Sequence, residues 1–269
     1  MRKYSINDQT CELPDGRILY RVVANRDFGC VKKDTVGGFI GDTQNLSQKG
    51  DCWVADDAAV YDEARVSANA WVGGSATIKG RAIITEFATV TDDALIDEYA
   101  YIGGHAHIKG STYISGEASV RGEVVASCVS FRSHSGKTLM PNISGRARLN
   151  GTVFLFDRIT IRGTASIDGI NVVIRDRVKI LENAGVFDNA LIEGHAVLSG
   201  DARAFQHCVI RDRTRVTNDA LVCGYAQIGG KSLITGRACI TGTACFHDQT
   251  FSGDQYVTTR NGLLHISTY

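Results

Sequence analysis

Residues 83–102 read IITEFATVTDDALIDEYAYI, and a branched aliphatic residue returns at every sixth position, at Ile84, Val90, Ile96 and Ile102. Four positions after each of these stands an Ala. A period of six matches neither the ~3.6 residues of a helical turn nor the ~2 of an ordinary strand. It therefore indicates a chain that is built from a short structural repeat.

The same pattern extends far beyond this stretch. Every sixth residue from 54 to 120 is Val or Ile, and the period returns between residues 143 and 240 with one slip of a single residue. Each unit has one aliphatic residue, which suits a short buried strand, and one small residue, which suits a corner. Three such units would form one triangular coil. Successive coils would then stack so that their strands pair in parallel, ~4.8 Å apart. Gly or a polar residue usually stands two positions after the aliphatic, as a tight corner requires. We therefore predict an all-β solenoid of about ten triangular coils.

The repeat resembles that of the hexapeptide-repeat superfamily, the bacterial transferase hexapeptide proteins, and this resemblance implies a left-handed parallel β-helix. The lead-in, with Gly37-Gly38-Phe39-Ile40 and Gly50-Asp51-Cys52-Trp53-Val54, resembles that of hexapeptide proteins from bacteria, phages and prophages that carry a transferase label inherited from their fold. The resemblance spans the whole chain but brings no agreed catalytic residues, so it says little about function.

The limits of the repeat predict three segments. We expect an N-terminal β cap over residues 1–50, the β-helix over 51–245 with an insertion at 123–142, and a C-terminal β hairpin or tail over 246–269. Caps are expected at both ends because an open solenoid end exposes core side chains and unpaired strand edges.

Composition narrows the possible partners and location. The chain has 29 basic and 29 acidic residues and a formal net charge of zero, which argues against a sequence-independent grip on nucleic acid. No apolar run is long enough to span a bilayer and no secretory signal is evident. We therefore expect a cytoplasmic protein that binds neither nucleic acid nor membrane, with its cysteines reduced.

Stacking of residues eighteen apart brings outward side chains into columns. The first column contains Trp53, Trp71 and His107, which stand just before inward aliphatic residues. Stacked exposed aromatic residues often mark an interface, so these three are candidate binding residues. An N-terminal cap or tail that folds over them explains the column equally well.

The second column is basic and contains Arg177, His195, Arg213 and Lys231. Basic groups repeated at ~4.8 Å would attract an anion, a phosphate ligand or an acidic partner. The alternative is a solvated ladder whose field is largely neutralised by neighbouring acidic residues.

The predicted insertion supplies a third group of candidates. Arg132, His134 and Lys137 lie in it, and a loop that projects from a rigid scaffold is a common place for a specific contact. A tolerated insertion without any binding role fits the sequence equally well.

Three histidines are weak candidates for catalysis. His105, His195 and His207 each stand three residues after an inward aliphatic residue. The resemblance implies that a hexapeptide acyltransferase would use such a His as a general base between subunits of a trimer. A solvated polar position gives the same pattern, and no acceptor-binding group accompanies any of the three.

No metal site is predicted. The γ-type carbonic anhydrases, which share the implied fold, hold zinc with three His residues. His105 and His107 are two residues apart and have no third ligand.

These observations favour a non-enzymatic binding or assembly protein without a cofactor, of a kind that a phage or prophage could encode and that acts on a host component. The alternative is a trimeric acyltransferase that uses acetyl-coenzyme A or a similar thioester, with an intersubunit His base. In either case we expect a homo-oligomer, either a dimer or a trimer, and a host protein is a candidate partner.

Overall fold

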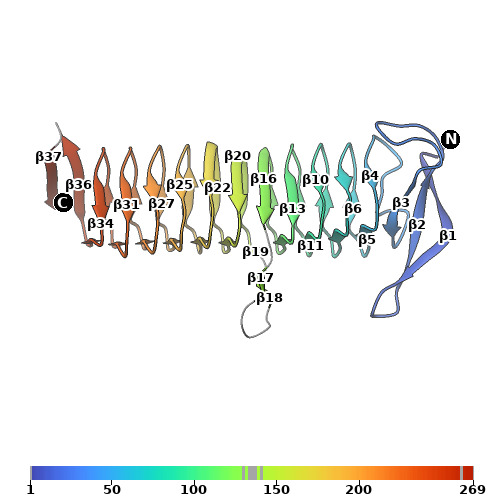
Figure 1. Ribbon diagram of the computed structural model, residues 1–269, viewed down its shortest axis with the longest axis horizontal. Coiled ribbons are helices and arrows are strands. Elements are labelled where there is room, and N and C mark those ends of the chain that lie inside the picture. Colours follow the sequence, from blue (N-terminus) through green and yellow to red (C-terminus); the bar gives the residue numbers. More distant parts are fainter. Residues whose placement is uncertain (1, 129–130, 133–137, 140–141, 261–262, 269) are drawn as a thin grey trace. The chain divides into compact units, whose positions relative to one another are not determined.

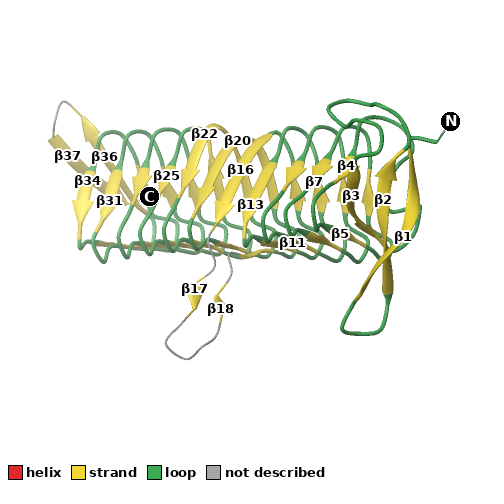
Figure 2. Ribbon diagram, turned by 45° about the vertical axis from the view of Figure 1, so that its right-hand side comes forward, coloured by secondary structure: helices red, strands yellow, loops and turns green. Residues whose placement is uncertain are grey.

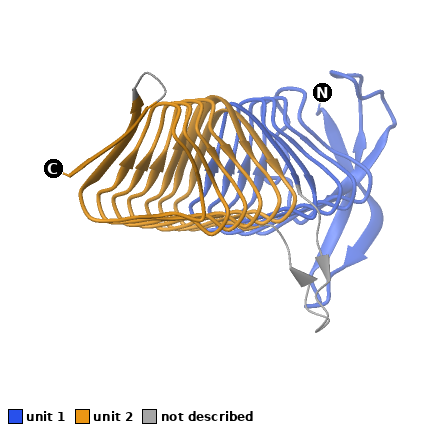
Figure 3. Ribbon diagram, turned by 60° about the vertical axis from the view of Figure 1, so that its left-hand side comes forward, with its two compact units in different colours: residues 1–130 blue, residues 131–269 orange. Residues whose placement is uncertain are grey.

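The computed structural model describes residues 2–128, 131–132, 138–139, 142–260 and 263–268. The chain divides into two units, Met1–Ser130 and Phe131–Tyr269 (Figure 3), and each is described by itself. The described residues form strands, turns and loops (Figure 2). Among them, no helix offers the long apolar stretch that crossing a bilayer would take.

The first unit begins with a small antiparallel sheet. Strand β1 (Tyr4–Glu12) pairs with β2 (Ile18–Ala24), and β2 pairs with β3 (Val36–Ile40). The last two residues of β3 then pair in parallel with β5 (Ala59–Val60). The N-terminal sheet is therefore continuous with the first coils of the β-helix (Figure 1).

The rest of the first unit consists of stacked coils whose neighbouring strands pair in parallel at a spacing of eighteen residues. Trp53 pairs with Trp71, and Trp71 with Thr89. The repeated aliphatic residues are at most 1% exposed, and the Ala residues that follow them lie at the narrow corners with no exposed surface. The coil strands besides β5 are β4 (Trp53–Val54), β6 (Arg65–Val66), β7 (Trp71–Val72), β8 (Thr77–Ile78), β9 (Ile83–Ile84), β10 (Thr89–Val90), β11 (Leu95–Ile96), β12 (Tyr101–Ile102), β13 (His107–Gly110), β14 (Tyr113–Ile114), β15 (Ser119–Val120) and β16 (Glu123–Cys128).

The start of the predicted insertion belongs to this stack. In β16, Val125 pairs with His107 of β13, and the eighteen-residue register continues to Cys128. The six-residue period of Val and Ile stops at Val120, so the sequence predicts either an insertion or a distorted coil for residues 123–142. Ala126 nevertheless occupies the inward position and is fully buried.

The second unit repeats this architecture. It begins with an antiparallel pair, β17 (Phe131–Arg132) and β18 (Thr138–Leu139), and ends with the antiparallel hairpin of β36 (Gln255–Arg260) and β37 (Leu263–Thr268). The strands between them are β19 (Asn142–Ile143), β20 (Arg148–Phe156), β21 (Thr160–Ile161), β22 (Ser166–Ile174), β23 (Lys179–Ile180), β24 (Gly185–Phe187), β25 (Leu191–Ile192), β26 (Val197–Leu198), β27 (Arg203–Ala204), β28 (Val209–Ile210), β29 (Arg215–Val216), β30 (Leu221–Val222), β31 (Gln227–Gly229), β32 (Leu233–Ile234), β33 (Cys239–Ile240), β34 (Cys245–His247) and β35 (Thr250–Phe251).

The slip in the sequence period is a bulge in β22. Gly151 of β20 pairs with Gly169 of β22, but Leu155 pairs with Ile174, so β22 contains one extra residue between these pairs. A bulge absorbs such a residue and lets the inward pattern resume in a shifted phase. Each unit thus consists of coils of a left-handed parallel β-helix, which confirms the predicted fold.

The corners adopt the backbone conformation that their residues suggested. Residues at the second position after an inward aliphatic residue have positive φ, for example 60° at Asp92, 69° at Asp176 and 75° at Gly194. Gly, Asp and Asn enter this left-handed region at lower cost than other residues, which explains their recurrence there.

Candidate functional site

Four polar side chains follow one corner of the second unit. Arg177, His195, Arg213 and Lys231 each stand three residues after an inward Ile, and all four are exposed. Their coils are held in register by the parallel pairs between β22 and β25, β25 and β28, and β28 and β31. The structure therefore brings together the basic column that the sequence predicted. We call these four residues the basic ladder.

The ladder side chains have few partners within the protein. A nitrogen of Arg177 (Nη1) lies 3.5 Å from Nε2 of His195. Among the described residues, the side chains of Arg213 and Lys231 have no hydrogen bond or ion pair. Two cationic groups of the ladder are therefore available to an external ligand.

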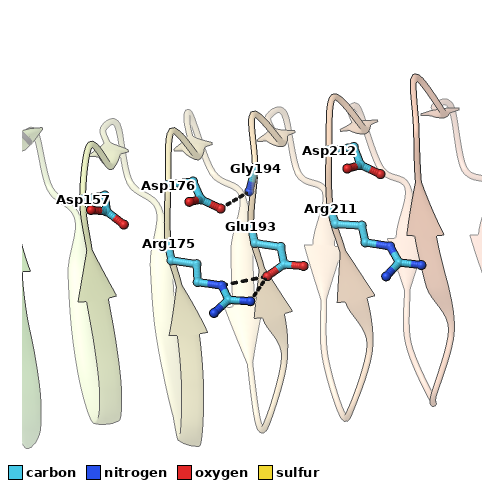
Figure 4. Close-up of a pocket in the computed structure, with 7 residues that line it drawn as sticks. All are labelled: Asp157, Arg175, Asp176, Glu193, Gly194, Arg211 and Asp212. Atoms are coloured by element: carbon cyan, nitrogen blue, oxygen red, sulfur yellow. Dashed lines mark hydrogen bonds and ion pairs between the residues drawn. The ribbon is translucent and has the colours of Figure 1, made fainter.

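A hollow of about 420 Å³ is lined by residues that immediately precede Arg177, His195 and Arg213 in the sequence, and Figure 4 shows its lining side chains. Its lining residues come from four successive coils and carry charges of both signs. They are Asp157, Arg175, Asp176, Glu193, Gly194, Arg211 and Asp212.

Most of the carboxylates in this hollow are already engaged. Oδ2 of Asp176 accepts a 2.9 Å hydrogen bond from the backbone N–H of Gly194, and Oδ2 of Asp212 accepts one of 2.8 Å from Gly230. Glu193 accepts a 2.7 Å hydrogen bond from Nε of Arg175 and pairs with the same guanidinium a second time. The hydrogen bond to Glu193 raises the pKa of Arg175.

Arg211 differs from Arg175, although both line the hollow. Arg211 is half-buried as a residue, and its side chain has no hydrogen-bonding or ion-pair partner in the described part of the chain. Figure 4 shows it without an interaction to the other residues drawn there. Arg211 therefore adds a third unpaired cation next to the ladder.

The catalytic candidates His105 and His207 are stacked on aromatic rings. The ring of His105 lies 4.9 Å from that of Phe87 with an angle of 3° between the planes, and His207 lies 4.8 Å from Tyr225 at 13°. Each pair is eighteen residues apart in one corner column, so the spacing rule could have found them. No carboxylate orients either ring: among the described residues, neither His105 nor His207 has an ion pair.

The described residues also hold no group of three His, Cys, Asp or Glu side chains arranged to bind a metal ion.

No family model matches this sequence, and no curated protein matches it. Several solved structures of acyltransferases are similar at low identity. The UDP-N-acetylglucosamine acyltransferase of Francisella novicida is 13% identical over 85% of this chain and 69% of its own, with a TM-score of 0.25. The UDP-N-acetylglucosamine O-acyltransferase of Moraxella catarrhalis is 15% identical over 85% and 72%, with a TM-score of 0.29. The UDP-N-acetylglucosamine acyltransferase of Arabidopsis is 14% identical over 86% and 72%, with a TM-score of 0.22.

The fold assignment rests on the strand register, in which a six-residue period and eighteen-residue coils occur together. The chain therefore has a β-helix fold built on a six-residue repeat. The similarities to acyltransferases carry no argument about its activity.

In this β-helix the predicted aromatic column is only partly exposed to solvent. Trp53, Trp71 and His107 do stack through Thr89. However, Trp53 is 1% exposed and its ring centroid lies 5.5 Å from that of Phe28. Trp53 thus belongs to the core beneath the N-terminal segment and cannot bind a partner, whereas Trp71 is half-buried and His107 is exposed.

The candidates in the predicted insertion stay a prediction. The backbone of Arg132 lies in β17, and His134 and Lys137 lie outside the described residues.

Proposed function

We propose that this protein is a non-enzymatic binding protein that holds an anionic ligand against the basic ladder and Arg211. The observation that supports this proposal is that two acidic side chains at the corner have hydrogen-bond partners within the protein and several basic ones do not. The carboxylates of Asp176 and Asp212 accept backbone hydrogen bonds, whereas Arg211, Arg213 and Lys231 are without partners among the described side chains.

The chemistry of the ladder suits an oxyanion. The guanidinium groups of Arg177 and Arg213 present forked donors that match a carboxylate, sulfate or phosphate, and Lys231 adds a compact charge. The strand pairs on both sides of the corner fix the backbone beneath each group. Little backbone order must be gained on binding, and this favours affinity.

The three histidines that the sequence offered as catalytic candidates support binding better than acyl transfer. A general base is usually oriented by a hydrogen bond from a third group, but His105 and His207 contact aromatic rings and His195 contacts a cation. None of these three candidate bases therefore has an orienting carboxylate among its described contacts.

Calorimetric titration tests the proposal with tripolyphosphate, coenzyme A and acetyl-coenzyme A as probes at low and high salt. We expect an anion to bind, with affinity that falls as salt rises. The double variant R177A/R213A should bind at least about tenfold more weakly, because two charge-assisted hydrogen bonds are lost. The control R203A removes an exposed arginine of β27 outside the ladder and should bind normally.

Two results would contradict the proposal. One is a failure of every anion to bind. The other is tight binding of acetyl-coenzyme A that survives R177A/R213A, which would favour the acyltransferase. Light scattering on the same samples tests the proposed homo-oligomer, and the phage origin and host partner stay predictions from the resemblance.

A further inference from the structure

We infer that the thiols of Cys223 and Cys239 form a two-coordinate site for a soft monovalent cation, of which Cu(I) is the biological representative. The site lies where β30 and β33 pair, and it shares no residue with the basic ladder or with the hollow. The inference is therefore independent of the proposed anion-binding function. It follows from the contact between the two thiols, from their offset in the sheet and from their surroundings.

The two thiols contact each other on the outward side of neighbouring strands. Cys239 pairs with Leu221, and Cys223 stands two residues after Leu221, so these three side chains share the outward face. A side-chain hydrogen bond joins Cys223 to Cys239, and another joins Cys223 to Thr241. Both cysteines are free thiols. Because sixteen residues separate them in the sequence, the eighteen-residue stacking rule does not reveal this contact.

The hydrogen bonds favour a thiolate at Cys223. The Cys239 thiol donates to the Cys223 sulfur, and this bond lowers the pKa of Cys223 and raises that of Cys239. The Thr241 hydroxyl donates to the same sulfur. A thiolate is the form of Cys that binds metals. A cation that binds here would take the place of the shared proton, forming one bond to each sulfur and releasing that proton to water.

The offset of the two residues suits a metal bridge and does not suit a disulfide. One strand separation of ~4.8 Å and two residues along a strand, ~6.6 Å, place the two Cα atoms roughly 8 Å apart. A disulfide requires Cα atoms within about 7 Å of each other, so its formation would displace the backbone of the coils. Two metal–sulfur bonds of ~2.3 Å each span about 4.6 Å between the sulfur atoms. A linear thiolate–metal–thiolate unit therefore bridges this diagonal pair while the coils stay in register.

The surroundings of the pair select the class of ion. Among the described residues, no third His, Cys, Asp or Glu completes a metal-binding group, so an ion that needs four protein ligands, such as structural Zn²⁺, is not held. Hard cations such as Mg²⁺ and Ca²⁺ prefer oxygen ligands, whereas thiolates select Cu(I). Cys223 is 8% exposed and Cys239 is half-buried. This burial limits the access of water to the bound ion.

Transfer of Cu(I) from its coloured complex with bicinchoninate tests the inference, with the full-length reduced chain in the absence of oxygen. We expect the wild type to withdraw one Cu(I) per chain, seen as a loss of the absorbance of the complex. C223S and C239S should each lower the affinity at least about hundredfold, because a single thiolate cannot chelate the ion. The matched control is C245S, which removes an exposed thiol of β34 and should bind copper as the wild type does.

X-ray absorption of the copper-loaded wild type provides a second measurement that depends on no variant, and it should show two sulfur neighbours. The inference is overturned if the wild type withdraws no copper, if C223S or C239S binds it normally, or if the ion has three or more sulfur neighbours. A disulfide between Cys223 and Cys239 after treatment with diamide would overturn the geometry on which it rests. Circular dichroism melts show that the three variants are folded. None of these results affects the anion titrations, so the inference and the proposed function fail separately.

Discussion

Asp92 and Gly110 occupy the same corner of successive coils, where Oδ2 of Asp92 accepts a 2.9 Å hydrogen bond from the backbone N–H of Gly110. The backbones of both residues are in the left-handed region, with φ of 60° at Asp92 and 68° at Gly110. Asp56 and Gly74 repeat the arrangement at 2.8 Å. The acidic side chain thus gives a partner to a corner N–H and joins one coil to the next.

Replacing Asp92 with Ala should lower the free energy of unfolding by about 1 kcal/mol, the net worth of one hydrogen bond. Asn keeps both the accepting oxygen and the tolerance of a left-handed backbone, so Asp92→Asn should change stability by less than about 0.5 kcal/mol. Urea titration of both variants measures the difference. If Asn destabilises as much as Ala, the hydrogen bond is not the cause.

Gly74 shows why Gly follows Asp in this corner column. A Cβ on Gly74 would lie 2.6 Å from the backbone N of Asp92 in the next coil. Gly74→Ala should therefore cost both the left-handed strain of about 1 kcal/mol and the displacement of a coil, at least about 2 kcal/mol in total.

Gly16 provides the matched control for this substitution. It has φ of 84°, and a Cβ there would meet nothing within 4 Å. Gly16→Ala should cost only the backbone strain, about 1 kcal/mol. Equal loss of stability in the two variants would show that the contact with the next coil is unimportant.

The coil strands and their inward residues could be predicted because they depend on local periodicity alone. Ile84 and Ile102 are eighteen residues apart and pair in the same sheet, as the period of six requires. The same period locates the corners, because Gly or a polar residue such as Asp usually stands two residues after an inward side chain. The backbone at these positions is left-handed.

The environment of the candidate residues could not be predicted because it depends on segments far apart in the sequence. Trp53 is covered by Phe28 from the N-terminal segment, and no period relates these two residues. The carboxylate of Asp212 lies beside the ladder, but the sequence does not show that it bonds to Gly230. This hydrogen bond occupies one carboxylate oxygen of Asp212, whereas the side chains of Arg213 and Lys231 have no partner among the described residues.

The burial of Trp53 predicts the fluorescence of the protein, whose two tryptophans are Trp53 and Trp71. In the variant W71F, emission from Trp53 should be blue-shifted and nearly insensitive to iodide, because this ring is 1% exposed. In W53F, the half-buried Trp71 should emit at longer wavelength and be quenched. Strong quenching of Trp53 would mean that the N-terminal segment does not cover it.

Tyr4 predicts how stability depends on alkaline pH. It is 1% exposed, its hydroxyl donates a 2.6 Å hydrogen bond to the carbonyl of Leu46, and burial raises its pKa from 10.0 to about 12. Because the folded state favours the neutral phenol, its contribution is complete below pH 10 and is lost as pH rises from 10 to 12. The loss should reach about 2 kcal/mol at the upper end.

The variant Y4F should be about 1 kcal/mol less stable at pH 7 but should lose less stability between pH 10 and 12. Y99F, which replaces a tyrosine that is 59% exposed, is the control and should keep the wild-type slope. A slope in Y4F as steep as in the wild type would assign the alkaline transition to other groups.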